Sequence, residues 1–246
     1  MKLPAITGII RRRILLNYRV APEVVEAILP ANFRPKFVNG YAIAGICLIR
    51  LEQLRPKGFP GVVGFSSENS AHRIAVEWED AAGNLREGVF VPRRDTDSYL
   101  TALGGGRIFP GVHHHSDFTV SDSAGRISIH ITEGKDHISL VGIQASETHQ
   151  FPESSVFGSF ENSSRFFEAG CVGYSSRPES CVLDGLLLKV GKWVVTPLEV
   201  DEVSSAYFDD HSIFPPDSID FDHALLMRDI PHEWHSEPEM TAERSL

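Results

Sequence analysis

Three consecutive histidines, His113–His115, are the most distinctive chemical groups in this 246-residue chain. The surrounding alternation predicts a strand, and successive side chains of a strand point to opposite faces. Only His113 and His115 could therefore share a metal ion, with Asp117 on the same side. His130, on the polar face of the next predicted strand, could supply a further ligand.

The same alternation turns His114 inward, together with Phe118 and Val120. A second strand carries Glu68 and His72 on its apolar face if it runs unbroken through both residues. An inward carboxylate costs several kcal/mol unless it is paired. We therefore expect Glu68 and His114 to line one pocket, in contact directly or through one water, with an arginine nearby. The alternative is a Glu68 exposed in a loop before the strand begins.

Several familiar site motifs are absent from the sequence. The glycine run Gly104–Gly106 lacks the Lys-Ser/Thr of a phosphate-binding loop, and neither G-x-S-x-G nor H-E-x-x-H occurs. The three cysteines, Cys47, Cys171 and Cys181, show no C-x-x-C spacing and are expected to be reduced thiols. The sequence predicts neither a cofactor nor a bound metal.

Composition narrows the class of protein. With 23 Lys and Arg against 33 Asp and Glu, the net charge is −10, which disfavours nucleic acid as a partner. No apolar run reaches the roughly 20 residues of a membrane-spanning helix, and the beginning of the chain does not resemble a signal peptide. We expect a cytoplasmic protein with no membrane partner.

Two-residue periodicity dominates the chain and predicts about ten strands. They are expected at 9–20, 41–54, 72–79, 85–91, 113–120, 126–133, 137–145, 182–190 and 197–208, some of them joined by tight turns. Helices are predicted at 23–29, 96–103 and 159–169. This arrangement favours a mainly β fold, a closed or nearly closed barrel, with a split sandwich as the alternative.

The domain organisation is expected to be simple. Residues 1–210 are predicted to form one domain, and 211–246 a C-terminal extension that is partly irregular. The acidic stretch from Pro231 is expected to be a loose tail.

Several segments resemble the acetoacetate decarboxylase-like superfamily, and within it an uncharacterised bacterial family, a domain of unknown function. The resemblance covers roughly Pro4 to Phe208. It rests on the order of segments at 22–30, 54–56, 95–98, 107–111, 165–167 and 193–200. It implies a closed, cone-shaped, largely antiparallel β-barrel with helices packed outside and a pocket within.

The resemblance also implies site residues. The decarboxylase carries Gly-Arg, five residues and a proline, then two lysines, the first of which forms a Schiff base with the substrate ketone. Counting from Arg107, His114 falls at that lysine and His115 at its neighbour. Glu68 matches a pocket glutamate. A pocket arginine would match Arg11, although strand alternation places Arg11 on the polar face.

The lysine-to-histidine difference decides the predicted function, because histidine has no primary amine with which to form an imine. We predict a small-molecule-binding barrel protein without acetoacetate decarboxylase activity. Its pocket would suit an oxo or carboxylate ligand held by Arg107, His72 and Arg11, beside His114 and Glu68. A homo-oligomer is possible.

Two other functions stay open. The first is a lyase, hydratase or isomerase of small oxo acids, with His114 as the acid–base group and Glu68 orienting it. The second is a metal-dependent hydrolase centred on His113, His115 and His130.

Overall fold

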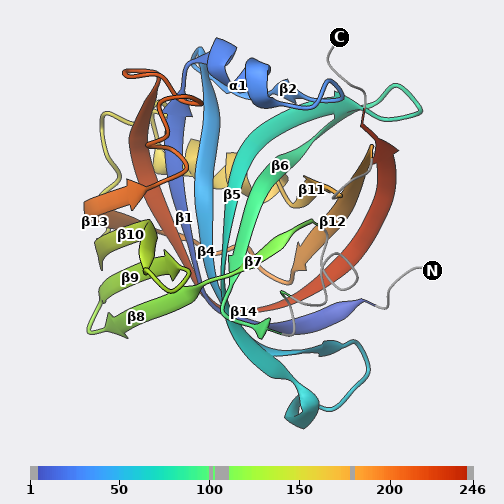
Figure 1. Ribbon diagram of the computed structural model, residues 1–246, viewed down its shortest axis with the longest axis vertical. Helices are drawn as coiled ribbons and strands as arrows, with labels where there is room; N and C mark the ends of the chain where they lie inside the picture. Colours follow the sequence, from blue (N-terminus) through green and yellow to red (C-terminus); the bar gives the residue numbers. More distant parts are fainter. Residues whose placement is uncertain (1–4, 100–101, 103–110, 178–180, 243–246) are drawn as a thin grey trace.

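The computed structural model describes residues 5–99, 102, 111–177 and 181–242. Seven of its strands form a closed ring in the order β1-β4-β5-β6-β11-β12-β14, because β14 also pairs with β1 (Figure 1). Neighbours in the ring are antiparallel, except for the parallel pair β6 and β11. Their bounds are Ile6–Val20 (β1), Tyr41–Pro56 (β4), Phe65–Glu79 (β5), Leu85–Thr96 (β6), Val172–Ser176 (β11), Val182–Val190 (β12) and Ile219–Thr241 (β14).

A second group of strands extends the sheet from the first half of β14. It runs in the order β13, β10, β9 and β8, formed by Thr196–Ser205, Ile138–Glu147, Arg126–Glu133 and Asp117–Ser123. The short strand β7 (His113–His115) pairs in parallel with β6, and a single residue separates it from β8. The chain therefore passes directly from the barrel to this extension of the sheet. The extension, formed by β8, β9, β10 and β13, is called the second sheet below and lies on the left in Figure 1.

Strands β1, β4, β5 and β6 form a wall that is buried on both faces. One face packs against the second sheet, and its core includes Ile14, Ile46 and Ile74 together with Ile129 of β9. The other face lines the barrel, where the core includes Leu15, Ile43, Cys47, Ala75 and Phe167. Since side chains alternate along a strand, sequence neighbours such as Ile14 and Leu15 enter different cores.

The helices and short elements pack around this frame. They are α1 (Pro22–Ile28), β2 (Arg34–Pro35), β3 (Phe37–Val38), the 3₁₀ turn η1 (Gly61–Val63) and α3 (Phe160–Ala169). Pro22 lies in the first turn of α1, where its missing N–H is no loss. Ser159 caps α3 by accepting from the Asn162 N–H at 3.2 Å. Phe167 of α3 is buried in the barrel core.

The mainly β barrel predicted from the sequence is confirmed, and so are the helices near 23–29 and 159–169. The loose tail expected from Pro231 is wrong, because that residue lies inside the 23-residue strand β14. The strand expected over 113–120 is interrupted at Ser116. Of the helix expected over 96–103, residues 100, 101 and 103 lie outside the described residues. Tyr99 and Ala102 are helical, whereas Thr96 still belongs to β6.

Among the described residues, no helix is long and apolar enough to cross a membrane.

Candidate functional site

The wall face toward the second sheet holds a buried ion pair. Glu68 on β5 is 8% exposed, and its Oε2 lies 2.7 Å from Nη2 of Arg12 on β1. Arg12 also reaches Asp122 of β8, with Nη1 to Oδ2 at 3.4 Å. Burial raises the pKa of Glu68, while the Arg12 guanidinium acts in the opposite direction. The inward carboxylate therefore has the cationic partner that its burial requires.

The cationic partner of Glu68 is Arg12. The family's pocket arginine, matched to Arg11 in the sequence, therefore corresponds in position to the next residue. The side chain of Arg11 is 48% exposed and pairs with Glu52 at 2.8 Å and with Asp229 at 2.5 Å. Alternation along β1 places Arg12 on the same face as Ile14, as the periodicity alone indicates. Arg11 therefore belongs to the surface.

His114 lies on the same side of the wall but contacts a different carboxylate. Its Nδ1 is 3.8 Å from Oε1 of Glu133, and its side chain is 42% exposed. Glu133 also accepts from Arg93, whose guanidinium bonds Asp95 at 2.9 Å. In the described part of the chain no direct hydrogen bond or ion pair joins His114 to Glu68. Their joint role stays a prediction.

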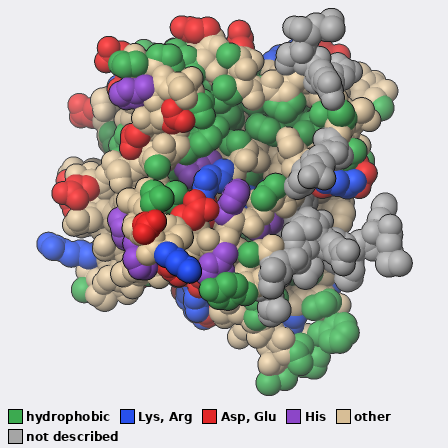
Figure 2. Space-filling view, viewed as in Figure 1, with side chains coloured by type: hydrophobic (Ala, Val, Ile, Leu, Met, Phe, Trp, Pro, Cys, Tyr) green, Lys and Arg blue, Asp and Glu red, His purple; other side chains and the backbone are tan. Residues whose placement is uncertain are grey.

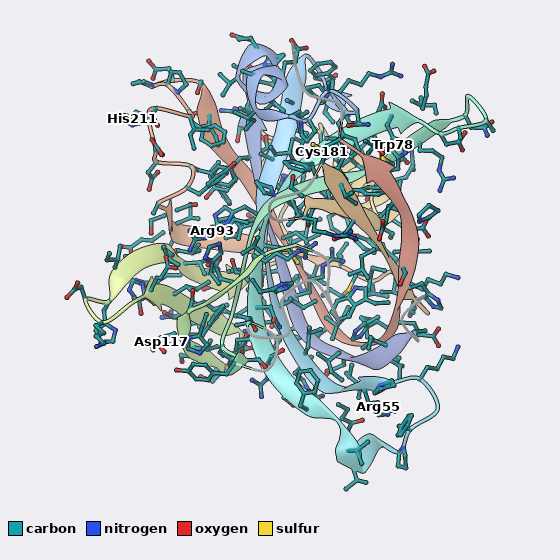
Figure 3. The ribbon with its side chains drawn as sticks, turned by 45° about the vertical axis from the view of Figure 1, so that its right-hand side comes forward. Arg55, Trp78, Arg93, Asp117, Cys181 and His211 are labelled. Carbon is teal, nitrogen blue, oxygen red and sulfur yellow. The ribbon has the colours of Figure 1, made fainter. Side chains whose placement is uncertain are left out.

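This part of the surface is visibly polar. Figure 2 shows histidine, arginine and acidic side chains gathered near the middle of the face that carries β7. Arg93 lies where the wall meets the second sheet, and Asp117 lies on β8 below it (Figure 3). Phe118 and Val120 of β8 pack against the core on this side, as the alternation predicts. The predicted inward position of His114 and outward position of His113 are wrong, because the side chain of His114 is 42% exposed and His113 lines the barrel cavity.

His72 is a core residue on this face. It is 2% exposed, its Nε2 lies 3.1 Å from Ser205 Oγ, and its ring packs against Tyr207 and Phe208. Burial lowers the pKa of His72 to about 3, and the nearby Arg93 acts in the same direction. His72 is therefore neutral at pH 7. Arg107, the other predicted ligand-binding residue, lies outside the described residues.

The three histidines proposed as metal ligands point in different directions. His113 lines the barrel cavity, His115 stacks on Tyr99 with ring centroids 3.7 Å apart, and His130 lies in a groove of the second sheet. No group of three or more His, Cys, Asp or Glu residues that could hold a metal occurs among the described residues. The predicted trio is therefore not assembled, because His113 faces the barrel cavity, His115 packs on Tyr99 and His130 lies on β9.

The other face of the wall encloses a cavity of about 130 Å³ inside the barrel. Apolar side chains such as Ile49, Leu51, Val91 and Leu188 form much of its lining. Every strand of the ring contributes to it, through Arg13, Cys47, Asn69, Val89, Val172, Leu186 and Trp234 among others. A single water needs only about 10–15 Å³ by the same kind of measure, so the space admits a small organic molecule.

Three arginines line this cavity without a carboxylate partner. Arg94 bonds Ser175 Oγ through Nη2 at 3.1 Å, Arg73 bonds the Asn17 side chain, and Arg13 Nε lies 3.3 Å from Cys47 Sγ. Within the described chain, none of these three arginines forms an ion pair. Burial lowers the pKa of both Arg73 and Arg94 to about 10, so both stay charged at pH 7.

The other ionisable groups of the lining do not neutralise these charges. Asp95, the acidic residue in the described lining, is already held by Arg93 and by Ser116 Oγ at 3.3 Å. Burial lowers the pKa of His113 to about 4, with Arg94 adding to the effect, so this imidazole is neutral at pH 7. The cavity is therefore cationic, and an anion would complement it.

Strand alternation does not identify these arginines as cavity residues, and the reason is physical. Alternation assigns Arg13 and Arg73 to a polar face, which is normally a face toward solvent. Here that face turns into a closed barrel, so its polar residues line a cavity. The sequence feature that could have indicated the cavity is the occurrence of several arginines within otherwise apolar strands.

Comparison with known proteins identifies the family. The model of the DUF2071 family, described as an uncharacterized conserved protein, matches residues 9–218, and the chain belongs to that family. No curated protein sequence matches the chain significantly.

Solved structures share the fold at low sequence identity. An acetoacetate decarboxylase from Legionella pneumophila has a TM-score of 0.62 and 14% identity, covering 97% of this chain and 89% of that one. The enduracididine biosynthesis enzyme MppR complexed with pyruvate has 0.59 and 12%, covering 98% and 91%. An acetoacetate decarboxylase-like enzyme from Sphingomonas wittichii RW1 has 0.55 and 13%, covering 98% and 93%. The predicted resemblance to this superfamily is confirmed.

Proposed function

We propose that this protein binds a small organic anion, an oxo or carboxylate compound, inside the barrel. The observation that carries the proposal is the set of three guanidiniums, Arg13, Arg73 and Arg94, around one cavity with no carboxylate partner in the described chain. Guanidinium groups bind carboxylates through short, charge-assisted hydrogen bonds. The ligand carboxylate would therefore supply the missing counter-charge.

The remaining lining supports a compact ligand with an apolar part. Ile49, Leu51 and Leu188 would contact the carbon skeleton, and His113 and Asn69 would offer hydrogen bonds to an oxo group. One structural relative is complexed with pyruvate, which is an oxo carboxylate of this size. Pyruvate is therefore the first compound to test.

The proposed function includes binding but no imine chemistry. No lysine lies in the described lining of the cavity, and position 114 carries histidine. We expect borohydride with pyruvate or acetoacetate to leave every lysine unmodified in the intact-mass spectrum. A reduced adduct on any lysine would show that the protein forms a Schiff base after all.

Binding is tested by thermal unfolding with pyruvate and, in parallel, with the neutral analogue acetone. Pyruvate at 100 times its Kd should stabilise the protein by about 2.7 kcal/mol, and acetone should have no effect. Arg94→Met should abolish the pyruvate effect, because it removes a guanidinium from the cavity. The matched surface variant Arg11→Met should retain it. Equal responses to pyruvate and acetone would refute the proposal.

A second candidate is acid–base chemistry at Glu68 and His114, favoured by the raised pKa of the buried Glu68. This function predicts exchange of the methyl protons of pyruvate in D₂O, followed by NMR. Exchange should slow at least about tenfold in His114→Gln. Exchange at the uncatalysed rate in the wild type would remove this candidate.

A further inference from the structure

Cys47, on strand β4, lines the cationic cavity. Cys47 is buried, and Arg13 donates a hydrogen bond from Nε to the Cys47 sulfur at 3.3 Å. The side chain of Cys47 also acts electrostatically on Arg73 and Arg94, in the direction that raises their pKa. A soft nucleophile thus lines the same cavity as the three guanidiniums that would bind the anion and contacts one of them.

The other two cysteines have different environments. Cys171 also lines the cavity, but its sulfur donates to the Glu168 carbonyl at 2.8 Å, and burial raises its pKa. Cys181 is exposed, near the end of the barrel that carries α1 (Figure 3). Only Cys47 has a guanidinium hydrogen bond to sulfur among these three thiols. Cationic neighbours of this kind are typical of reactive cysteines.

A separate observation concerns another arginine of the cavity lining. Arg73 is 5% exposed and lines the cavity, and its Nε has no hydrogen-bond partner within the described chain. A buried donor without an acceptor is costly, so an acceptor atom of a ligand would satisfy it. An oxo acid offers such oxygens on both its carboxylate and its carbonyl.

We propose that Cys47 adds reversibly to the carbonyl carbon of a 2-oxo acid held by these arginines. The sulfur–carbon bond forms as the π bond of the carbonyl breaks, and the thiol proton ends on the former carbonyl oxygen. The product is a hemithioketal, and nothing is oxidised or reduced. This inference rests on the proposed function, because the arginines must first bind the carboxylate.

The surrounding groups suit this step. A thiolate is the nucleophilic form of cysteine, and the Nε–H of Arg13 points to the Cys47 sulfur at 3.3 Å. As the carbonyl carbon is attacked, negative charge develops on its oxygen, where guanidinium donors stabilise it. The cavity thus offers a covalent route to oxo acids that requires no lysine.

The experiment uses pyruvate labelled with ¹³C at the carbonyl carbon and the full-length protein. In the wild type, the label should appear as a tetrahedral carbon attached to sulfur and oxygen. Cys181→Ser should keep this signal. Cys47→Ser and Cys47→Ala should lose it. Pyruvate should still stabilise both variants, because the arginines remain, but less than the wild type, because the covalent bond cannot form.

The outcomes separate the two proposals. If pyruvate stabilises the wild type but its label stays in the ketone region, or if the adduct persists without Cys47, the role of Cys47 is wrong and anion binding stands. If pyruvate neither stabilises the protein nor forms an adduct, both proposals are wrong.

Alkylation by bromopyruvate gives a second readout, with cysteines mapped by peptide mass spectrometry. Cys47 should react at least about tenfold faster than the exposed Cys181, and Arg94→Met should remove most of this advantage. An equal or faster reaction at Cys181 would contradict an activated Cys47.

Discussion

The two faces of the wall formed by β1, β4, β5 and β6 handle buried charge in opposite ways. Toward the second sheet, Arg12 is paired with Glu68 at 2.7 Å and with Asp122 at 3.4 Å. Toward the barrel cavity, the adjacent Arg13 and its neighbours Arg73 and Arg94 form no ion pair among the described residues. Two consecutive arginines of one strand therefore lie in different electrostatic environments, one paired with carboxylates and one without an ion pair among the described residues.

The difference is energetic as well as geometric. A buried charge is tolerated when a counter-charge and hydrogen bonds accompany it, and is costly otherwise. The face toward the second sheet meets this condition within the protein. Under the proposed function, the cavity face would meet it through a bound anion from solution.

The largest expected effect comes from removing the paired arginine. Arg12→Met should lower the free energy of unfolding by about 3–5 kcal/mol, because it leaves the carboxylate of Glu68 buried without its partner. Urea unfolding at pH 7 measures this change. The matched variant Arg11→Met breaks only exposed pairs and should leave the free energy of unfolding nearly unchanged. Equal costs for the two variants would show that the Arg12–Glu68 pair contributes no special stability.

Acid should lower the free energy of unfolding through both faces of the wall, since each face holds a buried neutral histidine. The folded-state pKa is about 3 for His72 and about 4 for His113, below the value near 6.5 expected for unfolded histidine. The unfolded state then binds more protons, so this stability is present above pH 6.5 and is lost as the pH falls toward 4.

Each such histidine contributes a slope of about 1.4 kcal/mol per pH unit in that window. His72→Gln should remove one such contribution, measured as the difference in unfolding free energy between pH 6.5 and pH 5. The exposed His211→Gln is the control and should leave the slope unchanged. A His72→Gln protein with the wild-type slope would mean that His72 is not held neutral.

The smallest expected change in the free energy of unfolding is that of Arg94→Met, and it should have the opposite sign to that of Arg12→Met. Arg94→Met in ligand-free protein should raise the free energy of unfolding by about 1 kcal/mol, because it replaces a partly buried, unpaired cation with an apolar side chain. Urea unfolding without added carboxylate measures it. Destabilisation as large as that of Arg12→Met would erase the contrast between the two faces.

The sequence allowed the barrel, most of its strands and the inward position of Glu68 to be predicted, because two-residue alternation records which side chains face a core. It also required a cationic partner for Glu68. The same alternation points to Arg12, and motif matching to a distant family shifted the choice to Arg11. Periodicity was therefore the better guide at that position.

Other features could not be read from the pattern. Strand β14 has six consecutive buried residues, from Asp222 to Met227, so it shows no alternation, and its polar members obscure the strand. The cavity arginines were assigned to a solvent face, because a single strand does not reveal that its polar face closes into a barrel. Both failures concern contacts between segments distant in sequence.

The most direct test of the account is a crystal structure of the protein grown with pyruvate. We predict density for the ligand inside the barrel, with its carboxylate oxygens about 2.7–2.9 Å from the guanidinium nitrogens of Arg94 or Arg13. Pyruvate bound instead beside Arg12 and Glu68, or an empty cavity at a concentration that stabilises the protein in solution, would contradict it.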